Sequence, residues 1–266
     1  MARRRLDEEL VRRGLVATRA EAESAVQSGR VLVSGIPAGK PSTLVAPGAA
    51  LGLAPPLERF VSRGGEKLRA ALERFHIDPT GSECLDAGAS TGGFTDCLLQ
   101  AGASAVAAVD VGYGQLAWSL RSDPRVHVFE RTNVRDLTRD DLPFAPGIVV
   151  ADLSFVSLRA VLPSIARLAA PSAAIVLLVK PQFEAPAGAV ATGGVVRDPI
   201  VWRRVLEEVV EACTGAGLGP IAVMVSPITG PAGNVEFLLH ARRDERGKPL
   251  DLVAAIDEAT VLAIPR

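Results

Sequence analysis

A glycine-rich stretch led by an aspartate follows the first strand predicted in the C-terminal part of the chain. It reads Asp86-Ala-Gly-Ala-Ser-Thr-Gly-Gly-Phe. Glycines at this place let the backbone approach a ligand at the start of the next helix. Asp110 ends the second predicted strand, and a carboxylate there can accept hydrogen bonds from both hydroxyls of a ribose. The pattern indicates a site for a nucleoside-containing ligand, although a glycine-rich turn can also be tight packing alone.

The glycine spacing differs from that of the dinucleotide fingerprint G-x-G-x-x-G. After Gly88 the next glycines are Gly92 and Gly93, and Ser90 stands where the middle glycine belongs. The leading aspartate suits a ligand with an ammonium group and no pyrophosphate, which favours S-adenosylmethionine over NAD as the cofactor. The residues predicted to bind it are Asp86, Gly88, Ser90, Thr91, Gly92, Gly93, Phe94, Asp110, Val111, Asn133 and Asp152.

Four ionisable side chains are expected beside this loop. Asp152 and Lys180 end the fourth and fifth predicted strands, and Glu236 lies at the beginning of the last one. Lys67 precedes the first strand, and it could reach the same edge of the sheet from the helix that it opens. Charged groups that converge in this way are typical of functional sites, whereas a single charge at a strand end is usually a surface ion pair.

The elements that must position these residues are short apolar strands alternating with helical patterns. Strands are predicted at 82–87, 105–109, 126–129, 147–152, 173–179, 219–226 and 234–241, and helices at 93–101, 115–121, 157–168 and 199–214. The alternation predicts an α/β fold with a mostly parallel sheet and helices on both faces. Two consecutive strands at the end predict that the last one is inserted antiparallel, which brings its start to the edge where ligands bind in such sheets.

The first 58 residues predict a small separate unit of two helices and a hairpin. Leu6 and Leu10 recur at helical spacing before Gly14, and Thr18 is a predicted N-cap with Glu21 completing a capping box. A strand from Arg30 turns at Ser34-Gly35, and a strand-like stretch covers 42–45. A Gly/Pro/Ala-rich segment then leads to Pro56.

The charge of the chain is unevenly distributed. The 266 residues carry a net charge of −1, but residues 1–75 hold 13 basic and 8 acidic side chains. A basic end on an acidic body suggests that this end meets a polyanion, although charges on a solvated surface can also cluster by chance. The basic side chains predicted to contact this polyanion are Arg3, Arg4, Arg5, Arg12, Arg13, Arg19, Arg30 and Lys40.

Composition excludes several classes of protein. Apolar residues make up 48% of the chain, which excludes global disorder, and no apolar run approaches the length of a membrane helix. The three cysteines form no close pair and the three histidines lie far apart, so neither a disulfide framework nor a metal site is expected. No apolar stretch follows the basic cluster at residues 3–5, so we expect no secretory signal there and a cytoplasmic protein without stable membrane association.

The N-terminal unit resembles the S4-type RNA-binding domain, in which a helix pair packs on a hairpin and presents a basic face to folded RNA. The matching stretches are Arg5-Leu-Asp, Leu10, Gly14, Thr18-Arg-Ala-Glu-Ala and Ser28-Gly-Arg-Val-Leu-Val-Ser-Gly. Arginines and lysines on a rigid face can bind the phosphates and shape of structured RNA. The alternative is a helical cap that merely packs on the larger domain.

The chain as a whole resembles the TlyA (hemolysin A) family of ribosomal RNA 2′-O-methyltransferases, whose catalytic domain is similar to the FtsJ type. The matching stretches are Val61-Ser-Arg-Gly-Gly-Glu-Lys-Leu, Asp86-Ala-Gly-Ala-Ser-Thr-Gly-Gly-Phe-Thr-Asp, Ala108-Val-Asp-Val-Gly-Tyr-Gly-Gln-Leu, Ala151-Asp-Leu-Ser-Phe, Lys180-Pro-Gln-Phe-Glu, Gly193-Gly-Val-Val-Arg-Asp-Pro and Gly230-Pro-Ala-Gly-Asn-Val-Glu-Phe. The resemblance implies an S4-like domain at 1–58, a linker and leading helix at 59–81, and a Rossmann-like class I methyltransferase domain at 82–266.

The resemblance also implies an activity. FtsJ-like enzymes use a Lys-Asp-Lys-Glu tetrad, and Lys67, Asp152, Lys180 and Glu236 fall on it one by one. The implied reaction is transfer of a methyl group from S-adenosylmethionine to cytidine riboses, with ribosomal RNA or ribosomal subunits as the partner and no metal. The oligomeric state stays open, with a monomer slightly favoured.

The chemistry of this reaction suggests a role for each of the four residues. A ribose 2′-hydroxyl is a poor nucleophile until it loses its proton, and a lysine can accept that proton or stabilise the forming alkoxide. We assign this role to Lys180, with Asp152 and Glu236 holding Lys180 and Lys67 in place. The remaining task is to align the hydroxyl, the methyl group and the sulfur.

Three other functions stay open at this point. The family's historical name implies a pore-forming cytolysin, against which the absence of a membrane segment argues. A non-catalytic RNA-binding ribosome-assembly protein could keep the cofactor pocket as a relic. An NAD-dependent oxidoreductase is disfavoured by the glycine spacing.

Overall fold

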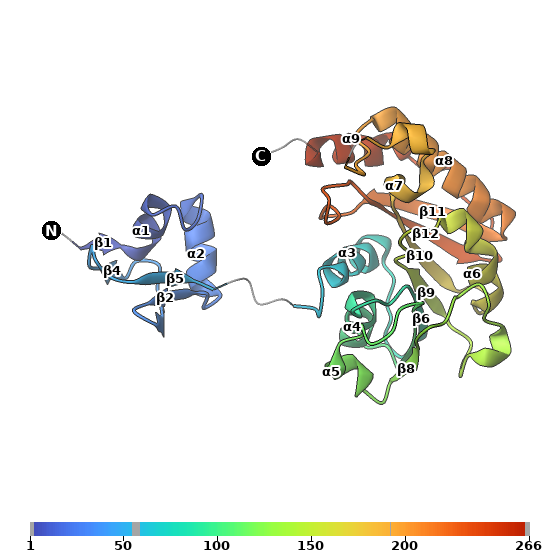
Figure 1. The fold of residues 1–266 in the computed structure, drawn as a ribbon, viewed down its shortest axis with the longest axis horizontal. Helices are drawn as coiled ribbons and strands as arrows, with labels where there is room; N and C mark the ends of the chain where they lie inside the picture. The colour runs from blue at the N-terminus through green and yellow to red at the C-terminus, as the bar shows by residue number, and fades with distance from the viewer. Residues whose placement is uncertain (1–2, 55–58, 192, 264–266) are drawn as a thin grey trace. The chain divides into compact units, whose positions relative to one another are not determined.

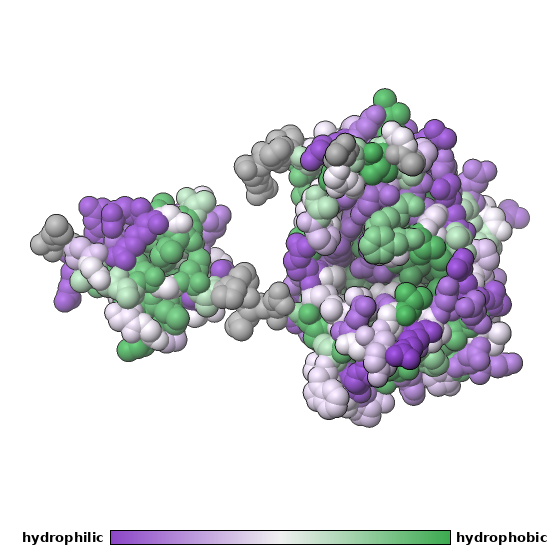
Figure 2. Space-filling view, viewed as in Figure 1, coloured by the Kyte–Doolittle hydropathy of each residue, from purple (hydrophilic) through white to green (hydrophobic). Residues whose placement is uncertain are grey.

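The computed structural model describes residues 3–54, 59–191 and 193–263. The chain divides into two compact units, Met1–Glu58 and Arg59–Arg266. Within the described residues, no helix is both long and apolar enough to span a membrane. Hydrophilic residues cover much of the visible face of the C-terminal unit, whereas the visible face of the N-terminal unit is divided between hydrophilic and hydrophobic residues (Figure 2).

The N-terminal unit packs two helices against short strands (Figure 1). Its elements are β1 (Arg4–Arg5), α1 (Leu6–Arg12), α2 (Arg19–Gln27), β2 (Val31–Val33), β3 (Ile36–Pro37), β4 (Leu44–Val45) and β5 (Leu51–Leu53). β1 pairs with β4, and β2 pairs antiparallel with both β3 and β5. Leu6 and Leu10 of α1 are buried against Val26 of α2 and Val31 of β2, so one small apolar core holds the helix pair on the strands.

Local signals explain how these short elements begin and turn. Ser34 and Gly35 both have positive φ, 53° and 82°, which is the hairpin turn that the sequence predicts. Thr18 accepts a hydrogen bond from the backbone N–H of Glu21, as predicted. The Glu21 carboxylate, however, accepts from the N–H of Ala17 rather than Thr18, so the capping box is displaced by one residue.

A seven-stranded sheet forms the centre of the C-terminal unit. Its strands are β6 (Glu83–Ala87), β7 (Ala105–Val109), β8 (Val126–Phe129), β9 (Ile148–Ala151), β10 (Ala174–Val179), β11 (Leu218–Val225) and β12 (Phe237–Arg243). They lie in the order β11-β12-β10-β9-β6-β7-β8. All are parallel except β12, which is antiparallel to both neighbours, as the sequence predicts.

Helices cover both faces of this sheet (Figure 1). On one face lie α3 (Gly64–Phe75), α4 (Gly93–Gln100) and α5 (Trp118–Arg121); on the other lie α6 (Leu162–Leu168), α8 (Pro199–Gly215) and α9 (Leu252–Leu262). The apolar run of β10 serves both cores. Ile175 and Leu177 pack in the core that holds Trp202 of α8, whereas Val176 and Leu178 pack in the core of α3 and α4.

Several predicted boundaries were wrong. The helix predicted at 115–121 begins only at Trp118, because the backbone before it is extended at Ala117. The helix predicted at 157–168 is divided at Val161 into a 3₁₀ turn, Leu158–Ala160, and α6, whose first turn contains a proline. Two elements, β5 and α9, were not predicted, and the last strand begins three residues later than predicted.

Candidate active site

Strand register brings three of the four ionisable residues to one edge of the sheet. Ala151 of β9 pairs with Leu177 of β10, and Val179 of β10 pairs with Phe237 of β12. Asp152 therefore follows directly after β9, Lys180 directly after β10, and Glu236 stands directly before β12. Because β12 runs antiparallel, its start lies beside the end of β10.

The fourth residue reaches this edge from α3. Lys67 Nζ lies 2.5 Å from Glu236 Oε2, and the two residues are 6% and 1% exposed. α3 can come this close because it packs on α4 through glycines at both helix starts. A Cβ at Gly93 would lie 2.2 Å from Ser62 Oγ and 3.0 Å from the backbone nitrogen of Gly65.

The second lysine makes two polar contacts. Lys180 Nζ lies 2.5 Å from Asp152 Oδ1 and donates a hydrogen bond to Ser154 Oγ at 2.8 Å. The structure thus pairs each lysine of the predicted tetrad with one carboxylate. Sequence reasoning missed Ser154, although its hydroxyl stands two residues after Asp152 in a matched stretch and could have been considered for that reason.

The glycine-rich loop after β6 forms one wall of a cavity of about 290 Å³. From the predicted cofactor set, this cavity is lined by Gly88, Ser90, Thr91, Gly93, Phe94 and Asp152. From the predicted tetrad, Lys67, Lys180 and Glu236 line it as well. Gly88 has φ +89°, and a Cβ there would lie 2.4 Å from the backbone oxygen of Asp152. Only glycine lets the loop pass this close to the end of β9.

A second cavity of about 500 Å³ lies next to the first. It is lined by Asp110, Val111 and Asn133, and it shares Gly88, Ser90, Asp152 and Ser154 with the first cavity. The Asp110 carboxylate accepts hydrogen bonds from the backbone N–H groups of Ser90 at 2.8 Å and Gly112 at 2.6 Å. This carboxylate therefore fixes the glycine-rich loop to the loop after β7.

Two buried carboxylates in α1 organise the predicted RNA-binding arginines. Asp7 pairs with Arg5 and Arg19, and Glu9 pairs with Arg12 and Arg13. The hydrogen bond from Arg5 lowers the pKa of Asp7, and hydrogen bonds from Arg12 and then Arg13 lower the pKa of Glu9 to about 2. These ion pairs hold the four arginines in place.

The other predicted RNA-binding residues fall into two groups. Arg30 donates to the backbone oxygen of Ala54, and Arg13 donates to backbone oxygens of the segment before β5, so both also support the fold. Arg3, Arg4 and Lys40 are exposed. Arg12 and Arg19 are exposed as well, but they pair with Glu9 and Asp7, whereas Arg3, Arg4 and Lys40 have no ion pair among the described residues.

Comparison with known proteins agrees with this geometry. Residues 60–243 match the family described as FtsJ-like methyltransferase, and residues 4–51 match the S4 domain. The 16S/23S rRNA (cytidine-2'-O)-methyltransferase TlyA of Mycobacterium tuberculosis is 52% identical over 244 residues, which is 91% of each chain. The chain belongs to the TlyA family.

Other members of the TlyA family carry the name hemolysin. Hemolysin A of Brachyspira hyodysenteriae is 37% identical over 89% of this chain and 98% of its own. The solved structure titled "Putative hemolysin from Streptococcus thermophilus" has a TM-score of 0.73 and 38% identity, and the match covers 99% of this chain and 96% of that one. The predicted family and fold class are therefore confirmed.

Two of the predicted cofactor contacts, Asp86 and Gly92, line neither of the two cavities. Asp86 has no exposed surface, and it lines neither cavity. Its Oδ2 accepts a hydrogen bond from Thr95 Oγ1 at 2.7 Å, whereas Oδ1 has no partner. Gly92 lies under the loop, where a Cβ would stand 2.2 Å from Leu120 Cδ1. Asp86 of β6 is thus bonded to α4, and Gly92 stands directly before α4 and packs against Leu120.

Burial raises the pKa of Asp86 to about 7. In the unfolded chain this carboxyl ionises above about pH 4, whereas in the folded protein it keeps its proton up to about pH 7. The unfolded state then binds fewer protons in that range, so stability falls as the pH rises from about 4 to 7. Above about pH 7 Asp86 is ionised in both states, so its contribution to the free energy of unfolding no longer changes with pH.

Asp86→Asn should remove this loss, because asparagine cannot ionise and can still accept from Thr95. The free energy of unfolding, measured in denaturant from pH 4 to pH 8, should rise relative to the wild type by up to roughly 4 kcal/mol toward pH 8. Asp140→Asn, at an exposed aspartate, is the matched control and should show no such trend. A difference between Asp86→Asn and the wild type that is the same at every pH would contradict this account.

Proposed function

We propose that this chain transfers a methyl group from S-adenosylmethionine to the ribose 2′-hydroxyl of cytidine in ribosomal RNA. The observation that carries the proposal is the arrangement of the Lys67–Glu236 and Lys180–Asp152 pairs on the wall of a cavity built by the glycine-rich loop. The name of the M. tuberculosis relative supports the choice of substrate. We place the reaction in the cytoplasm, on ribosomal RNA or a ribosomal subunit, with a monomer as the working unit.

The two cavities fit the proposed cofactor in chemistry. S-adenosylmethionine supplies a methyl group on a positively charged sulfur. The Asp110 oxygens each accept one backbone N–H, which leaves a lone pair on each for a ribose hydroxyl. Asn133 and Val111 line the same cavity and would hold the nucleoside part. The backbone from Gly88 to Ser90, which lines both cavities, would hold the methionyl part.

Lys180 is the residue placed to act on the hydroxyl. Asp152 and Ser154 hold its Nζ at the point where the two cavities meet. A 2′-hydroxyl beside Nζ can pass its proton to the lysine or be stabilised by its charge as the oxygen becomes negative. Lys67, buried and paired with Glu236, adds a fixed positive charge to the same cavity.

Loss of the Asp110 carboxylate should abolish cofactor binding. Asp110→Ala removes the acceptor for the ribose and releases the backbone N–H groups of Ser90 and Gly112. Isothermal titration calorimetry with S-adenosylmethionine should show saturable binding to the wild type and to Asp140→Ala, and none to Asp110→Ala. Binding of NAD by the wild type, without binding of S-adenosylmethionine, would replace this proposal by an oxidoreductase.

Loss of the Lys180 amine should slow the chemical step. Lys180→Ala should lower the single-turnover rate of methyl transfer to ribosomal RNA by roughly a hundred- to ten-thousand-fold. Lys180→Arg should rescue little, because an arginine stays charged and cannot accept a proton. Binding of S-adenosylmethionine and of RNA should survive, because the lysine acts on the transition state.

The matched control for this experiment is Lys248→Ala. Lys248 is exposed, and its backbone N–H bonds to Pro220 near the start of β11, at the opposite edge of the sheet. It should keep the wild-type rate. Full activity in Lys180→Ala would refute the assignment, and the absence of activity in the wild type would favour a ribosome-assembly protein.

Reversing exposed charges on the S4 domain should weaken RNA binding without unfolding the domain. Arg4→Glu with Lys40→Glu avoids the arginines that neutralise Asp7 and Glu9. If both contact phosphates, the affinity for ribosomal RNA should fall and the slope of log K against log salt should decrease in magnitude by about 2. Arg246→Glu with Lys248→Glu, at two exposed residues of the other unit, controls for net charge. Unchanged affinity and slope would mean that these two side chains make no contact with the RNA.

A further inference from the structure

Glu184 is a buried carboxylate that takes no part in the proposed proton transfer. It ends α7 (Pro181–Glu184), the single helical turn that follows Lys180, and its side chain is 2% exposed. Its Oε1 accepts a hydrogen bond from the backbone N–H of Leu158 at 2.6 Å, and its Oε2 accepts from Ser157 Oγ at 2.6 Å. Both partners lie in the segment that follows Asp152, not in the segment of Glu184 itself.

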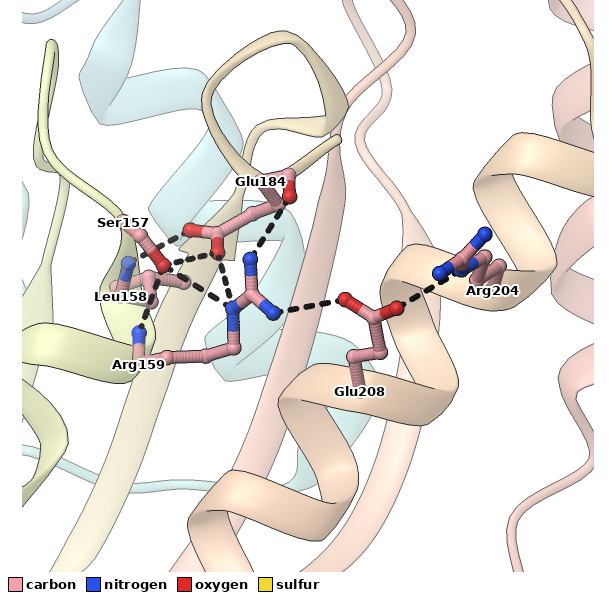
Figure 3. Close-up of polar contacts among 6 residues, drawn as sticks. All are labelled: Ser157, Leu158, Arg159, Glu184, Arg204 and Glu208. Atoms are coloured by element: carbon pink, nitrogen blue, oxygen red, sulfur yellow. Dashed lines mark hydrogen bonds and ion pairs between the residues drawn. The ribbon is translucent and has the colours of Figure 1, made fainter. Parts of the chain in front are cut away.

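An arginine completes the environment of this carboxylate (Figure 3). Arg159 Nε lies 3.4 Å from Glu184 Oε2, and Arg159 Nη2 donates to the backbone oxygen of Glu184 at 2.9 Å. On its other side, Arg159 Nη1 donates to Glu208 Oε2 of α8 at 2.7 Å, and Arg204 bonds the second oxygen of Glu208. Buried and partnered by an N–H, an O–H and a guanidinium, Glu184 is fixed in place.

Contacts join the segment after β9 to the segment after β10 at successive levels. The strand pairing itself ends at Ala151 and Leu177, so beyond these residues no ladder sets the distance between the two segments. Moving away from the sheet, the contacts are Asp152 with Lys180, Ser154 with Lys180, the rings of Phe155 and Phe183 at 5.2 Å, and Ser157 and Leu158 with Glu184. The Glu184 contacts are the last level, and they close the loop that begins at Asp152 and Lys180.

We propose that Glu184 is a positioning residue for methyl transfer: it fastens the segment after β10 to the segment after β9 and thereby holds Lys180 Nζ between Asp152 and Ser154. The inference rests on the proposed function, since it concerns the lysine to which that function assigns the proton. A displacement of a reacting group on the order of 1 Å can cost ~100-fold in rate. A residue that only sets the place of Lys180 can therefore have a large effect on the reaction.

The variant that tests this role is Glu184→Gln. Glutamine keeps the shape and one acceptor for Leu158, but it turns an N–H₂ group toward Ser157 and Arg159, which are both donors to Glu184 in the native protein. With RNA and S-adenosylmethionine saturating, the single-turnover rate should fall at least about tenfold. The dissociation constants for S-adenosylmethionine and RNA should stay within about twofold, because Glu184 lines neither cavity.

Glu208→Gln is the matched control. Glu208 binds the same arginine as Glu184, Arg159. That arginine is its single hydrogen-bond partner in the described part of the segment after Asp152, because its other oxygen accepts from Arg204. This variant should keep the wild-type rate within about twofold. An equal loss of rate in both variants would show that the ion pairs around Arg159 act as a whole, and it would overturn a specific role for Glu184.

A spectroscopic measurement separates this inference from the proposed function. The chain has four lysines, Lys40, Lys67, Lys180 and Lys248. Protein labelled with lysine ¹³Cε gives one side-chain signal for each, and Lys180→Ala identifies the signal of Lys180. Glu184→Gln should shift the Lys180 signal and leave those of Lys40 and Lys248 unchanged, while Glu208→Gln should shift none of them. The measurement does not depend on methyl transfer, so it tests the role of Glu184 even if the wild type is inactive.

A wild-type rate in Glu184→Gln would overturn the inference, and so would a slow rate with an unshifted Lys180 signal. The same conclusion follows if Glu184→Gln slows the residual reaction of Lys180→Ala as strongly as it slows the wild type, because a residue that acts through Lys180 has no effect once the lysine is gone. If Glu184→Gln does not fold, Ser157→Ala takes its place. It removes one of the two hydrogen bonds and should produce a smaller shift of the same signal and a smaller loss of rate.

Discussion

The buried ion pair between Lys67 and Glu236 is the interaction on which the site depends. Both charges are removed from water, and each is tolerated only because the other lies 2.5 Å away. Removing one partner of such a pair typically costs about 3–5 kcal/mol, since the remaining charge stays buried and unpaired. The pair also joins α3, which precedes the sheet in the chain, to the start of β12, which is the last strand. The cavity is therefore lined on this side by one residue from near the start of the C-terminal unit and one from near its end.

The antiparallel insertion of β12 makes this pair possible. In a fully parallel sheet the residue before β12 would lie at the opposite edge from Asp152 and Lys180. With β12 reversed, Glu236 stands next to the end of β10, where Val179 pairs with Phe237. The two lysines then lie on one wall of the cavity, each held by its own carboxylate. Chemistry at this edge is therefore set by strand direction as much as by residue type.

Much of this arrangement could be predicted from the sequence, because a change from apolar to charged residues marks the end of a buried strand. The apolar runs of β9 and β10 are buried on both faces, so a charged residue that follows them, such as Asp152 or Lys180, marks the edge of the sheet. The direction of β12 followed from its place directly after another strand. The matched family stretches then gave the four residues their roles, which the geometry alone would not have assigned.

Other features depend on contacts that no local pattern reveals. Asp86 lies inside β6, where it pairs with Val150 of β9, whereas Asp152 stands just beyond the end of β9. Asp86 therefore has no exposed surface, although both aspartates follow apolar residues in the sequence. The missing side chain of Gly92 makes room for Leu120, 28 positions further along the chain, and the glycine-rich pattern does not reveal this contact. Ser154 and Glu184 act through partners on a neighbouring segment, so their importance is visible only when the segments after β9 and β10 are seen together.

The most direct test of the account is to identify the modified nucleoside. Ribosomal subunits that lack the modification should be incubated with the wild-type protein and S-adenosylmethionine carrying a deuterated methyl group, and the RNA then digested and analysed by mass spectrometry. The account predicts the label in 2′-O-methylcytidine, in stoichiometric amount at a defined position. Label on a base, on the ribose of another nucleoside, or in no nucleoside at all would contradict it.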